Sequence, residues 1–341
     1  MKPLRLGLIG TGVAARLLHW PALKQMTDRY RLVAVANRTR TKAEAFADMA
    51  GLDAGAVYSD YQELLARDDL DVVLLALPPE FNYEVARVVA EAGLDIICEK
   101  PIAATIDDAQ AMARLPQEFG VRLLIAENFR YDAAVLKTRE LIDAGRIGPP
   151  FMVSYQFVQS VPPGDEIAGR PWRQNPVHAG GIFSDHGVHM IDVVRYLMGE
   201  VAAVQVFGRD LRGDLVGIDT AVYNLKFESG AVGSIQWSFA VASEPDWLIQ
   251  LWAENGTLRI TPSEVHLQQK GQPDELVPVL PGQSFVNEFL DFYEALLHDQ
   301  SPVMTVQDAL QDLRTVLAAH QSAESGVVVS LNTERNCETQ R

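Results

Sequence analysis

The sequence predicts an α/β protein with two domains, the first built on a parallel sheet and the second, of α+β type, on a large, mostly antiparallel sheet. The chain has 341 residues, more than a single hydrophobic core usually serves. Residues 1–126 alternate short apolar runs with longer amphipathic segments, whereas residues 127–331 contain runs with period-2 alternation. These observations place a domain in each part. Residues 332–341 are polar and form an expected frayed tail.

Short runs rich in Val, Ile and Leu predict buried strands in the first domain. They are Leu4–Ile9, Tyr30–Ala36, Val72–Leu77, Asp95–Cys98 and Arg122–Ala126. Helical spacing is found in the segments between them, Thr41–Ala50, Tyr61–Ala66 and Tyr83–Ala92. Strands that are apolar throughout and alternate with helices indicate a parallel sheet covered on both faces.

The second domain shows a different pattern, with strands that follow one another through hairpin-like turns. The predicted strands are Phe151–Gln159, Ala203–Asp210, Thr220–Phe227, Ala231–Ala240, Trp247–Ala253 and Thr257–Ile260. Turn signals such as Glu228-Ser229-Gly230 and Glu254-Asn255-Gly256 join several of them. Helices are predicted at about Asp185–Met198 and Phe285–His298.

Composition and charge exclude several classes of protein. Hydrophobic residues make up 48% and charged residues 22%, as in ordinary globular proteins. The net charge of −16 argues against nucleic acid or an anionic membrane as the main partner. No apolar stretch reaches the ~18 residues of a transmembrane helix, and glycines and Arg16 interrupt the apolar N-terminus, so we expect no signal peptide. The distant Cys98 and Cys337 predict neither a disulfide nor a metal site, and we expect a cytoplasmic protein.

A glycine-rich turn follows the first predicted strand. Residues 10–15 read Gly-Thr-Gly-Val-Ala-Ala and open a predicted helix. Gly10 permits a tight turn, Gly12 lets the backbone approach a pyrophosphate, and a small side chain at Ala15 allows close helix–strand packing. We therefore expect a doubly wound, Rossmann-type domain in which Gly10, Gly12, Val13 and Ala14 contact a dinucleotide. The alternative is a tight turn without a ligand.

The end of the second predicted strand bears on the choice of cofactor. NAD-binding domains usually place an Asp or Glu there to bind the ribose 2′-hydroxyl. This chain has Asn37 and Arg38 instead, followed by Arg40. A guanidinium holds a 2′-phosphate through charge-assisted hydrogen bonds, so the sequence favours NADP(H), with NADH possible. The alternative is that both arginines are solvated charges at the start of a helix.

A lysine closes the strand predicted at Asp95–Cys98. The sequence continues Glu99-Lys100-Pro101, which places Lys100 at the carboxyl end of a parallel strand, beside the crevice where such sheets bind ligands. Pro101 fixes the following chain, and a cis bond before it would aim the lysine. The alternative is an ordinary strand end at the surface.

One predicted helix carries an imidazole and two carboxylates on a single face. Asp185, His189 and Asp192 are spaced i, i+4 and i+7. A histidine with a carboxylate partner suits acid–base catalysis near neutral pH. Gly187 costs such a helix ~1 kcal/mol relative to Ala, which indicates close approach of a bulky group. The alternative is a buried histidine in a structural salt bridge.

Together these motifs resemble the Gfo/Idh/MocA family, which includes glucose–fructose oxidoreductase and inositol dehydrogenase. The resemblance covers nearly the whole chain. Besides the motifs above, it includes Leu77-Pro78-Pro79, Asn128-Phe129-Arg130-Tyr131, Trp172-Arg173, Gly180-Gly181, Glu254-Asn255-Gly256-Thr257-Leu258 and Ser322-Ala323-x-Ser325-Gly326. Their order and spacing carry the resemblance, since no single motif is decisive.

The resemblance implies roles for residues at matching positions. Lys100, Asp185 and His189 would surround the nicotinamide and the reacting carbon, with Lys100 stabilising developing negative charge and His189 transferring a proton. Leu77, Pro78, Glu99 and Lys100 would contact the cofactor. Substrate would meet Asn128, Arg130, Trp172, Arg173, Asp185 and His189, with Tyr131 nearby. Two positions depart from the pattern: Asn82 replaces a frequent histidine, which weakens a cofactor contact at that turn, and Leu94 replaces a lysine.

The expected activity is therefore hydride transfer between NADP(H) and a carbonyl or hydroxyl carbon of a small sugar-, polyol- or cyclic-diol-like substrate. Two alternatives stay open. An NAD-dependent glycoside hydrolase of the same fold would use the same Lys and His, and a dinucleotide-binding sensor would lack turnover. The apolar alternation of Val222, Leu225, Phe227, Ile235, Trp237 and Phe239 predicts a partly apolar second sheet face, and hence a homodimer or homotetramer.

Overall fold

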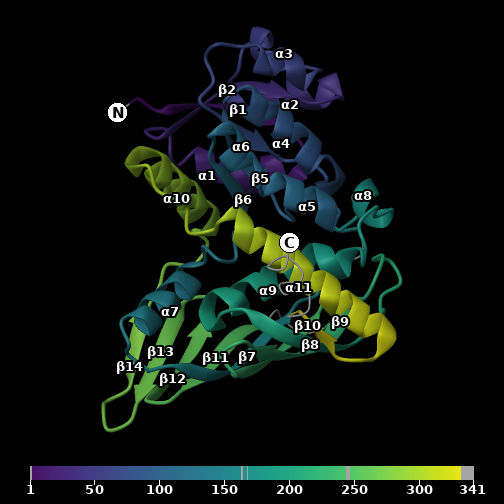
Figure 1. Ribbon diagram of the computed structural model, residues 1–341. Helices are drawn as coiled ribbons and strands as arrows, with labels where there is room; N and C mark the ends of the chain where they lie inside the picture. The colour runs from purple at the N-terminus through teal and green to yellow at the C-terminus, as the bar shows by residue number, and fades with distance from the viewer. Residues whose placement is uncertain (1, 163, 167, 243–245, 332–341) are drawn as a thin grey trace. The chain divides into compact units, whose positions relative to one another are not determined.

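The computed structural model describes residues 2–162, 164–166, 168–242 and 246–331, and two compact units are formed (Figure 1). One consists of Met1–Glu127 with Phe285–Leu310, and the other of Asn128–Ser284 with Gln311–Arg341, in each case as far as these segments are described. The sequence places residues 285–310 in the second domain instead. The predicted tail, residues 332–341 with Cys337, lies outside the described residues.

The first unit contains a six-stranded sheet among its described residues, and all of its strands are parallel. Their order is β3 (Val57–Tyr58), β2 (Tyr30–Ala36), β1 (Leu4–Ile9), β4 (Val72–Leu75), β5 (Asp95–Glu99) and β6 (Leu123–Ala126). From β1 the chain adds β2 and β3 on one side and then β4, β5 and β6 on the other. The change of side between β1 and β4 is the switch point of a doubly wound sheet. The prediction of a Rossmann-type parallel sheet is thus confirmed.

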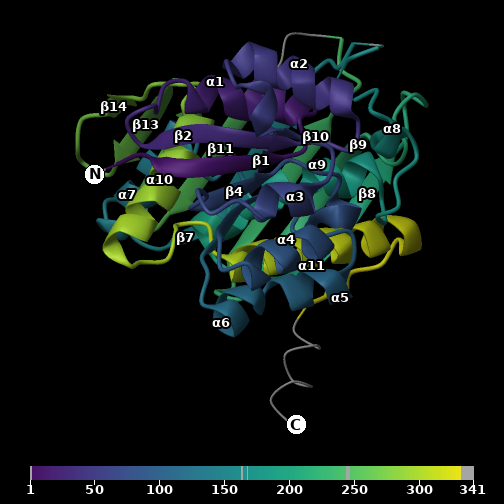
Figure 2. The ribbon, with the colours of Figure 1, turned by 90° about the horizontal axis from the view of Figure 1, so that it is seen from above.

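Helices cover both faces of this sheet, with α1 and α2 on one side and α4 and α5 on the other (Figure 2). The helical segments of the unit are η1 (Ala15–His19), α1 (Trp20–Leu23), α2 (Arg40–Ala50), η2 (Ala54–Ala56), α3 (Tyr61–Leu65), η3 (Pro79–Phe81), α4 (Asn82–Glu91), α5 (Ile106–Met112), α6 (Leu115–Phe119) and α10 (Ser284–His298).

Packing against the first helix and β2 explains why α10 belongs to the first unit. The Tyr30 hydroxyl donates a hydrogen bond to the Phe289 carbonyl at 2.7 Å. The rings of His19 and Tyr30 meet the Phe289 ring edge to face, with centroids 5.7 and 5.5 Å apart. Burial of Phe289 and Phe292 then attaches the helix to this core.

The second unit contains a nine-stranded sheet among its described residues. Its order is β14 (Glu275–Pro278), β13 (Glu264–Gln269), β12 (Gly256–Thr261), β11 (Asp246–Ala253), β7 (Pro150–Val158), β10 (Val232–Ser238), β9 (Thr220–Phe227), β8 (Val201–Arg209) and β15 (Val329–Ser330). The β7–β10 pair is parallel and the others are antiparallel. The predicted α+β domain with a mostly antiparallel sheet is confirmed, although β13, β14 and β15 are additional.

Helices α7 (Ala133–Asp143), α9 (Ile182–Met198) and most of α11 (Val306–Ser325) lie on one face of this sheet, and a short α8 (Pro171–Gln174) precedes α9 (Figure 1). The sequence predicts α9 and α10 but not α7 or α11. Gly187 lies where α9 and α11 meet, since a Cβ there would be 2.7 Å from Val316 Cγ2. The expected close approach at Gly187 is therefore confirmed.

The two sides of the large sheet differ in exposure. Leu225, Phe227, Ile235, Trp237 and Phe239 are buried. Val222 is exposed and faces exposed Phe207 across the β8–β9 pair, but Asn224 and Lys226 are also exposed on the same strand. Most of the residues expected to make an apolar outer face thus belong to the core, and the oligomer remains a prediction.

No helix among the described residues is long and apolar enough to cross a membrane.

Replacing Gly187 with alanine tests the packing of α9 on α11. The extra methyl group would overlap Val316, and overpacking a core usually costs ~1–3 kcal/mol. The higher helix propensity of alanine offsets up to about 1 kcal/mol of this cost. We therefore expect Gly187→Ala to lower the free energy of unfolding by about 1–2 kcal/mol in urea denaturation.

Gly55→Ala serves as the control, because no atom lies within 4 Å of a Cβ at Gly55. Equal stability of the two variants would contradict the packing described for Gly187.

Candidate functional site

The glycine turn after β1 has the geometry that a dinucleotide-binding turn requires. Gly10 has φ +95°, and a Cβ there would meet the Ala76 carbonyl oxygen and lie 3.0 Å from Leu77 Cδ2. A side chain at Gly10 is therefore excluded by both conformation and space. At Gly12 no atom lies within 4 Å of a Cβ position, so the backbone is open to a ligand. Val13 and Ala14 begin the helix that continues through η1 and α1.

The end of β2 is joined to this turn. The side-chain amide of Asn37 donates to Thr11 Oγ1 at 2.9 Å, and its oxygen accepts from the Thr39 backbone N–H at 3.0 Å. Asn37 therefore fixes the chain on either side of Arg38. This places the predicted cofactor residue Asn37 at the turn, with its amide group already engaged by the protein.

The two arginines after β2 have different surroundings. Arg40 pairs with Glu44 on the next turn of α2, with 2.8 Å between Nε and Oε1. The Arg38 guanidinium instead lies over the Phe81 ring, 5.0 Å from its centroid. Within the described part of the chain Arg38 has no ion pair with an acidic side chain. Its exposed charge is thus the one open to an anionic group.

The lysine of the turn after β5 lies between two carbonyl groups bound by one side chain. The Lys100–Pro101 bond is cis, which is one of the two forms that the proline allows. Nδ2 of Asn82, at the start of α4, is 2.9 Å from the carbonyl oxygens of both Glu99 and Pro101. The Glu99 carboxylate is 2.7 Å from Nε2 of His19. Leu77 and Pro78, at the adjacent end of β4, are half-buried.

A carboxyl group without a hydrogen-bond partner lies beside this turn. Glu288 of α10 is fully buried, and neither side-chain oxygen has a partner among the described residues. Burial raises the pKa of Glu288 well above its ordinary value, and the carboxylates of Glu99, Glu127 and Asp291 raise it further. The Glu288 carboxyl therefore keeps its proton to a higher pH than an exposed glutamate does.

Helix α9 presents His189 in an aromatic environment of the second unit. The imidazole stacks on the Phe129 ring, with centroids 4.2 Å apart and planes inclined by 14°. The His186 ring meets it edge to face at 5.1 Å. His189 is 6% exposed, so its ring is held in one orientation by neighbours on both sides.

Asp185 is bound to an arginine of the segment before α9. Nε of Arg173 donates to Oδ2 of Asp185 at 2.8 Å, and Asp185 is almost fully buried. The Arg173 guanidinium lies 4.6 Å from the centroid of the half-buried Trp172 ring. The structure thus brings together three predicted substrate residues, Asp185, Arg173 and Trp172.

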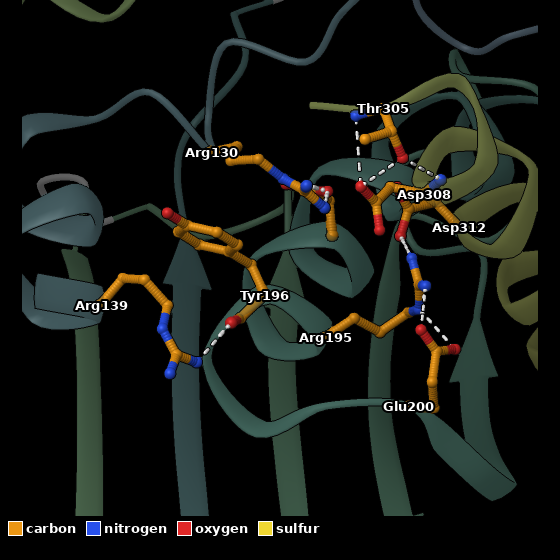
Figure 3. A network of polar contacts seen from close by, with 9 residues as sticks. Arg130, Arg139, Arg195, Tyr196, Glu200, Thr305, Asp308 and Asp312 are labelled. Atoms are coloured by element: carbon orange, nitrogen blue, oxygen red, sulfur yellow. Dashed lines mark hydrogen bonds and ion pairs between the residues drawn. The ribbon is translucent and has the colours of Figure 1, made fainter. Parts of the chain in front are cut away.

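Arg130 and Asn128 are also engaged within the second unit. Arg130 is buried, and its Nε donates to the buried Asp192 carboxylate at 2.9 Å, while its Nη2 donates to the same oxygen (Figure 3). Nδ2 of Asn128 is 3.3 Å from Oγ of Ser284. This buried ion pair favours a structural role for Arg130 over the predicted contact with substrate.

A second buried arginine secures the same helix. Arg195 of α9 donates to Oε1 of Glu200 at 2.6 Å and to the Asp312 carboxylate of α11 (Figure 3). Nη1 of Arg139 in α7 donates to the Tyr196 carbonyl at 3.1 Å. Contacts to α7, to α11 and to the chain that follows therefore hold the C-terminal half of α9 in place.

Sequence reasoning missed the roles of His19, Asn82 and Phe129. Phe129 lies within a motif that the sequence singles out, His19 and Asn82 follow such motifs, and the partners of all three are distant in sequence. The sequence identifies Asn82 only as a departure that weakens a cofactor contact. The structure shows its amide bonded inside the protein instead. Within the described ranges no group of three His, Cys, Asp or Glu residues has an arrangement that could hold a metal ion.

Two family comparisons cover most of the chain. Residues 4–127 match the family described as "Oxidoreductase family, NAD-binding Rossmann fold", and residues 139–331 match "Oxidoreductase family, C-terminal alpha/beta domain".

Individual relatives align along nearly their full length. D-xylose 1-dehydrogenase (NADP(+)) 2 of Haloferax volcanii is 28% identical over 335 residues, which cover 96% of this chain and 98% of the relative. The scyllo-inositol 2-dehydrogenase (NAD(+)) of Bacillus subtilis is 27% identical over 318 residues, covering 89% and 90%. A crystal structure of an oxidoreductase from Thermotoga maritima gives a TM-score of 0.88 at 32% identity, covering 97% of this chain and 99% of that one.

The raised pKa of Glu288 predicts a pH-dependent stability. The unfolded chain loses this proton above about pH 4.3, whereas the folded chain retains it, so the contribution of Glu288 to stability falls as pH rises towards its folded pKa. Glu288→Gln removes this loss. We expect the Tm of the variant, relative to the native chain, to be higher at pH 8 than at pH 5.

Glu294→Gln on the same helix is the control, since 44% of the Glu294 side chain is exposed. The same Tm difference at both pH values for Glu288→Gln would show that the buried carboxyl does not stay protonated.

Proposed function

The chain belongs to the Gfo/Idh/MocA family of oxidoreductases, and on that premise we propose that it transfers hydride between NADP(H) and a carbonyl or hydroxyl carbon of a sugar-, polyol- or cyclic-diol-like substrate. The observation that carries this proposal is the set of groups at the carboxyl ends of neighbouring strands in the first unit. The glycine turn follows β1, Arg38 follows β2 and Lys100 follows β5. Ligands of doubly wound sheets bind outside these strand ends.

The residues present fit a dinucleotide. Gly10 makes the tight turn, the open backbone at Gly12 suits a pyrophosphate, and Val13 and Ala14 continue the turn. Leu77, Pro78 and Glu99 would border the cofactor further along the strand ends. When bound, the nicotinamide supplies or accepts the hydride.

Arg38 supports NADP(H) over NAD(H). The chain has no acidic residue at the end of β2 to bind a ribose 2′-hydroxyl, and Asn37 is already bonded to Thr11 and Thr39. The Arg38 guanidinium, supported by the Phe81 ring, would bind the 2′-phosphate. The NADP(+)-dependent relative supports this choice, while the NAD(+)-dependent one shows that the family uses both cofactors.

Within the reaction, Lys100 and His189 would act on the substrate oxygen. As hydride reaches a carbonyl carbon, its oxygen gains negative charge, which the ammonium group of Lys100 would stabilise. His189 would donate the proton that completes the hydroxyl, and in the oxidative direction it would accept that proton. Stacking on Phe129 would hold the imidazole in position, and Asp185, paired with Arg173, would orient or bind the substrate.

The residues around Asp185 support a polyhydroxylated substrate. The Trp172 ring offers an apolar face to the C–H groups of a sugar or cyclic polyol, and Arg173 and Asp185 offer hydrogen-bonding groups. The named activities of the two curated relatives, on D-xylose and scyllo-inositol, support the same class.

Arg38→Ala tests the choice of cofactor. Loss of charge-assisted hydrogen bonds worth ~1.5–3 kcal/mol should weaken NADPH binding by ~10–100-fold and leave NADH binding nearly unchanged. Titration of nicotinamide fluorescence measures both. Arg40→Ala is the matched control, because Arg40 is paired with Glu44. An equal loss of affinity for NADPH and NADH in Arg38→Ala would contradict the role of Arg38 in binding the 2′-phosphate.

Lys100→Ala and His189→Ala test the chemical roles. We expect each to lower kcat by ~10²–10⁴-fold, with the Kd for NADPH close to that of the native enzyme. Steady-state kinetics and cofactor titration measure the two quantities. The half-buried Lys137, which pairs with Glu140, and the exposed His298 provide alanine controls. Near-native turnover in both active-site variants would refute the mechanism.

A further inference from the structure

The amide of Asn82 is buried and directed at the turn that carries Lys100. Asn82 is 0% exposed at the start of α4. Its Nδ2 lies 2.9 Å from the Glu99 carbonyl oxygen and 2.9 Å from the Pro101 carbonyl oxygen. The two acceptors belong to the residues immediately before and after Lys100. One side chain therefore binds the backbone on both sides of the lysine.

The chemistry of the amide matches this arrangement. A primary amide has two N–H donors on one nitrogen, and here each has a carbonyl acceptor. A carboxylate of the same shape offers no donor and would repel both carbonyl oxygens. An imidazole at the same place could serve only one of them with one N–H group.

A second buried side chain, that of His19, binds the same turn through the Glu99 carboxylate. Nε2 of His19 is 2.7 Å from Oε1 of Glu99, and His19 is 1% exposed. The turn is thus bound through its backbone by α4 and through the Glu99 side chain by the helical segment after the glycine turn. Lys100 is the residue between these attachments, and its own side chain takes part in neither bond.

We propose that Asn82 is a positioning residue that sets the direction of the Lys100 side chain by binding the carbonyl groups on both sides of it. This inference rests on the proposed role of Lys100. Asn82 contacts neither substrate nor cofactor in the proposal, and its effect on turnover passes through the lysine. A displacement of ~1 Å at a catalytic group can cost ~10²-fold in rate, so the two bonds have a measurable consequence.

Asn82→Asp is the main variant, because it keeps the shape and removes both donors. We expect kcat to fall by ~10–100-fold at a temperature well below the Tm, while KM and the Kd for NADPH stay close to native. The kinetic substrate is the sugar or polyol that the native enzyme turns over fastest. Hydrogen exchange should accelerate in the peptide containing Glu99–Ala104 and stay unchanged in β1.

Asn82→His is the conservative variant and should recover part of the lost kcat, since one N–H group can bind one carbonyl. It also keeps the proposal testable if the aspartate variant does not fold. Glu84→Gln is the matched control, because Glu84 is exposed on the same turn of α4. It should leave kcat and exchange unchanged.

A double-mutant cycle with Lys100→Ala decides whether Asn82 acts through Lys100. We expect Lys100→Ala/Asn82→Asp to be no slower than Lys100→Ala alone. Full additivity of the two losses, or native kcat in Asn82→Asp with only a lower Tm, would overturn the inference. Failure of the proposed function is distinguishable, because Lys100→Ala alone would then keep near-native turnover.

Discussion

The need to neutralise or bond each buried polar group where it lies governs most of the features described above. Asp185 and Asp192 of α9 are almost completely buried, and each is matched by an arginine from another segment. Removing one partner of such a pair usually costs ~3–5 kcal/mol, so these pairs restrict how α9 can be placed in the second unit. In the first unit the same requirement joins His19 to Glu99 and Asn82 to two backbone carbonyls. For Glu288, whose side-chain oxygens have no hydrogen-bond partner among the described residues, burial raises the pKa instead.

This requirement also distinguishes the side chains that are bound in ion pairs from those that are held by other contacts. On α9 the predicted face of Asp185, His189 and Asp192 is real, but its members differ in use. Asp192 is committed to Arg130 near the middle of the helix, whereas His189 is held by aromatic stacking on Phe129. Among the arginines after β2, Arg40 forms an ion pair with Glu44, whereas Arg38 lies over the Phe81 ring. Among these residues the structure thus separates the ion-paired Asp192 and Arg40 from His189, which stacks on a ring, and from Arg38, which lies over one.

Local patterns in the sequence were sufficient for the fold class, for most strands to within two residues, and for the close packing at Gly187. Apolar runs and glycine turns are decided by neighbours in sequence, which is why those predictions succeeded. The short strands β14 and β15 have little periodicity, and α7 and α11 were not recognised. The grouping of α10 with the first unit depends on the contact of Phe289 with Tyr30, which lies 259 residues away in the sequence. The same holds for the partners of Arg130 and Asn82, because long-range contacts leave no periodic signal in a single sequence.

The most direct test of the proposed function is the rate at which the purified protein oxidises NADPH and NADH in the presence of ketoses, inososes, anhydrosugars and dicarbonyl compounds, followed by nicotinamide absorbance. The proposed activity predicts turnover with at least one polyhydroxylated carbonyl compound, faster with NADPH than with NADH. Tight NADPH binding without turnover of any compound, together with cleavage of aryl glycosides, would contradict it and identify a hydrolase of the same fold. Tight binding with neither activity would contradict it in favour of a dinucleotide sensor.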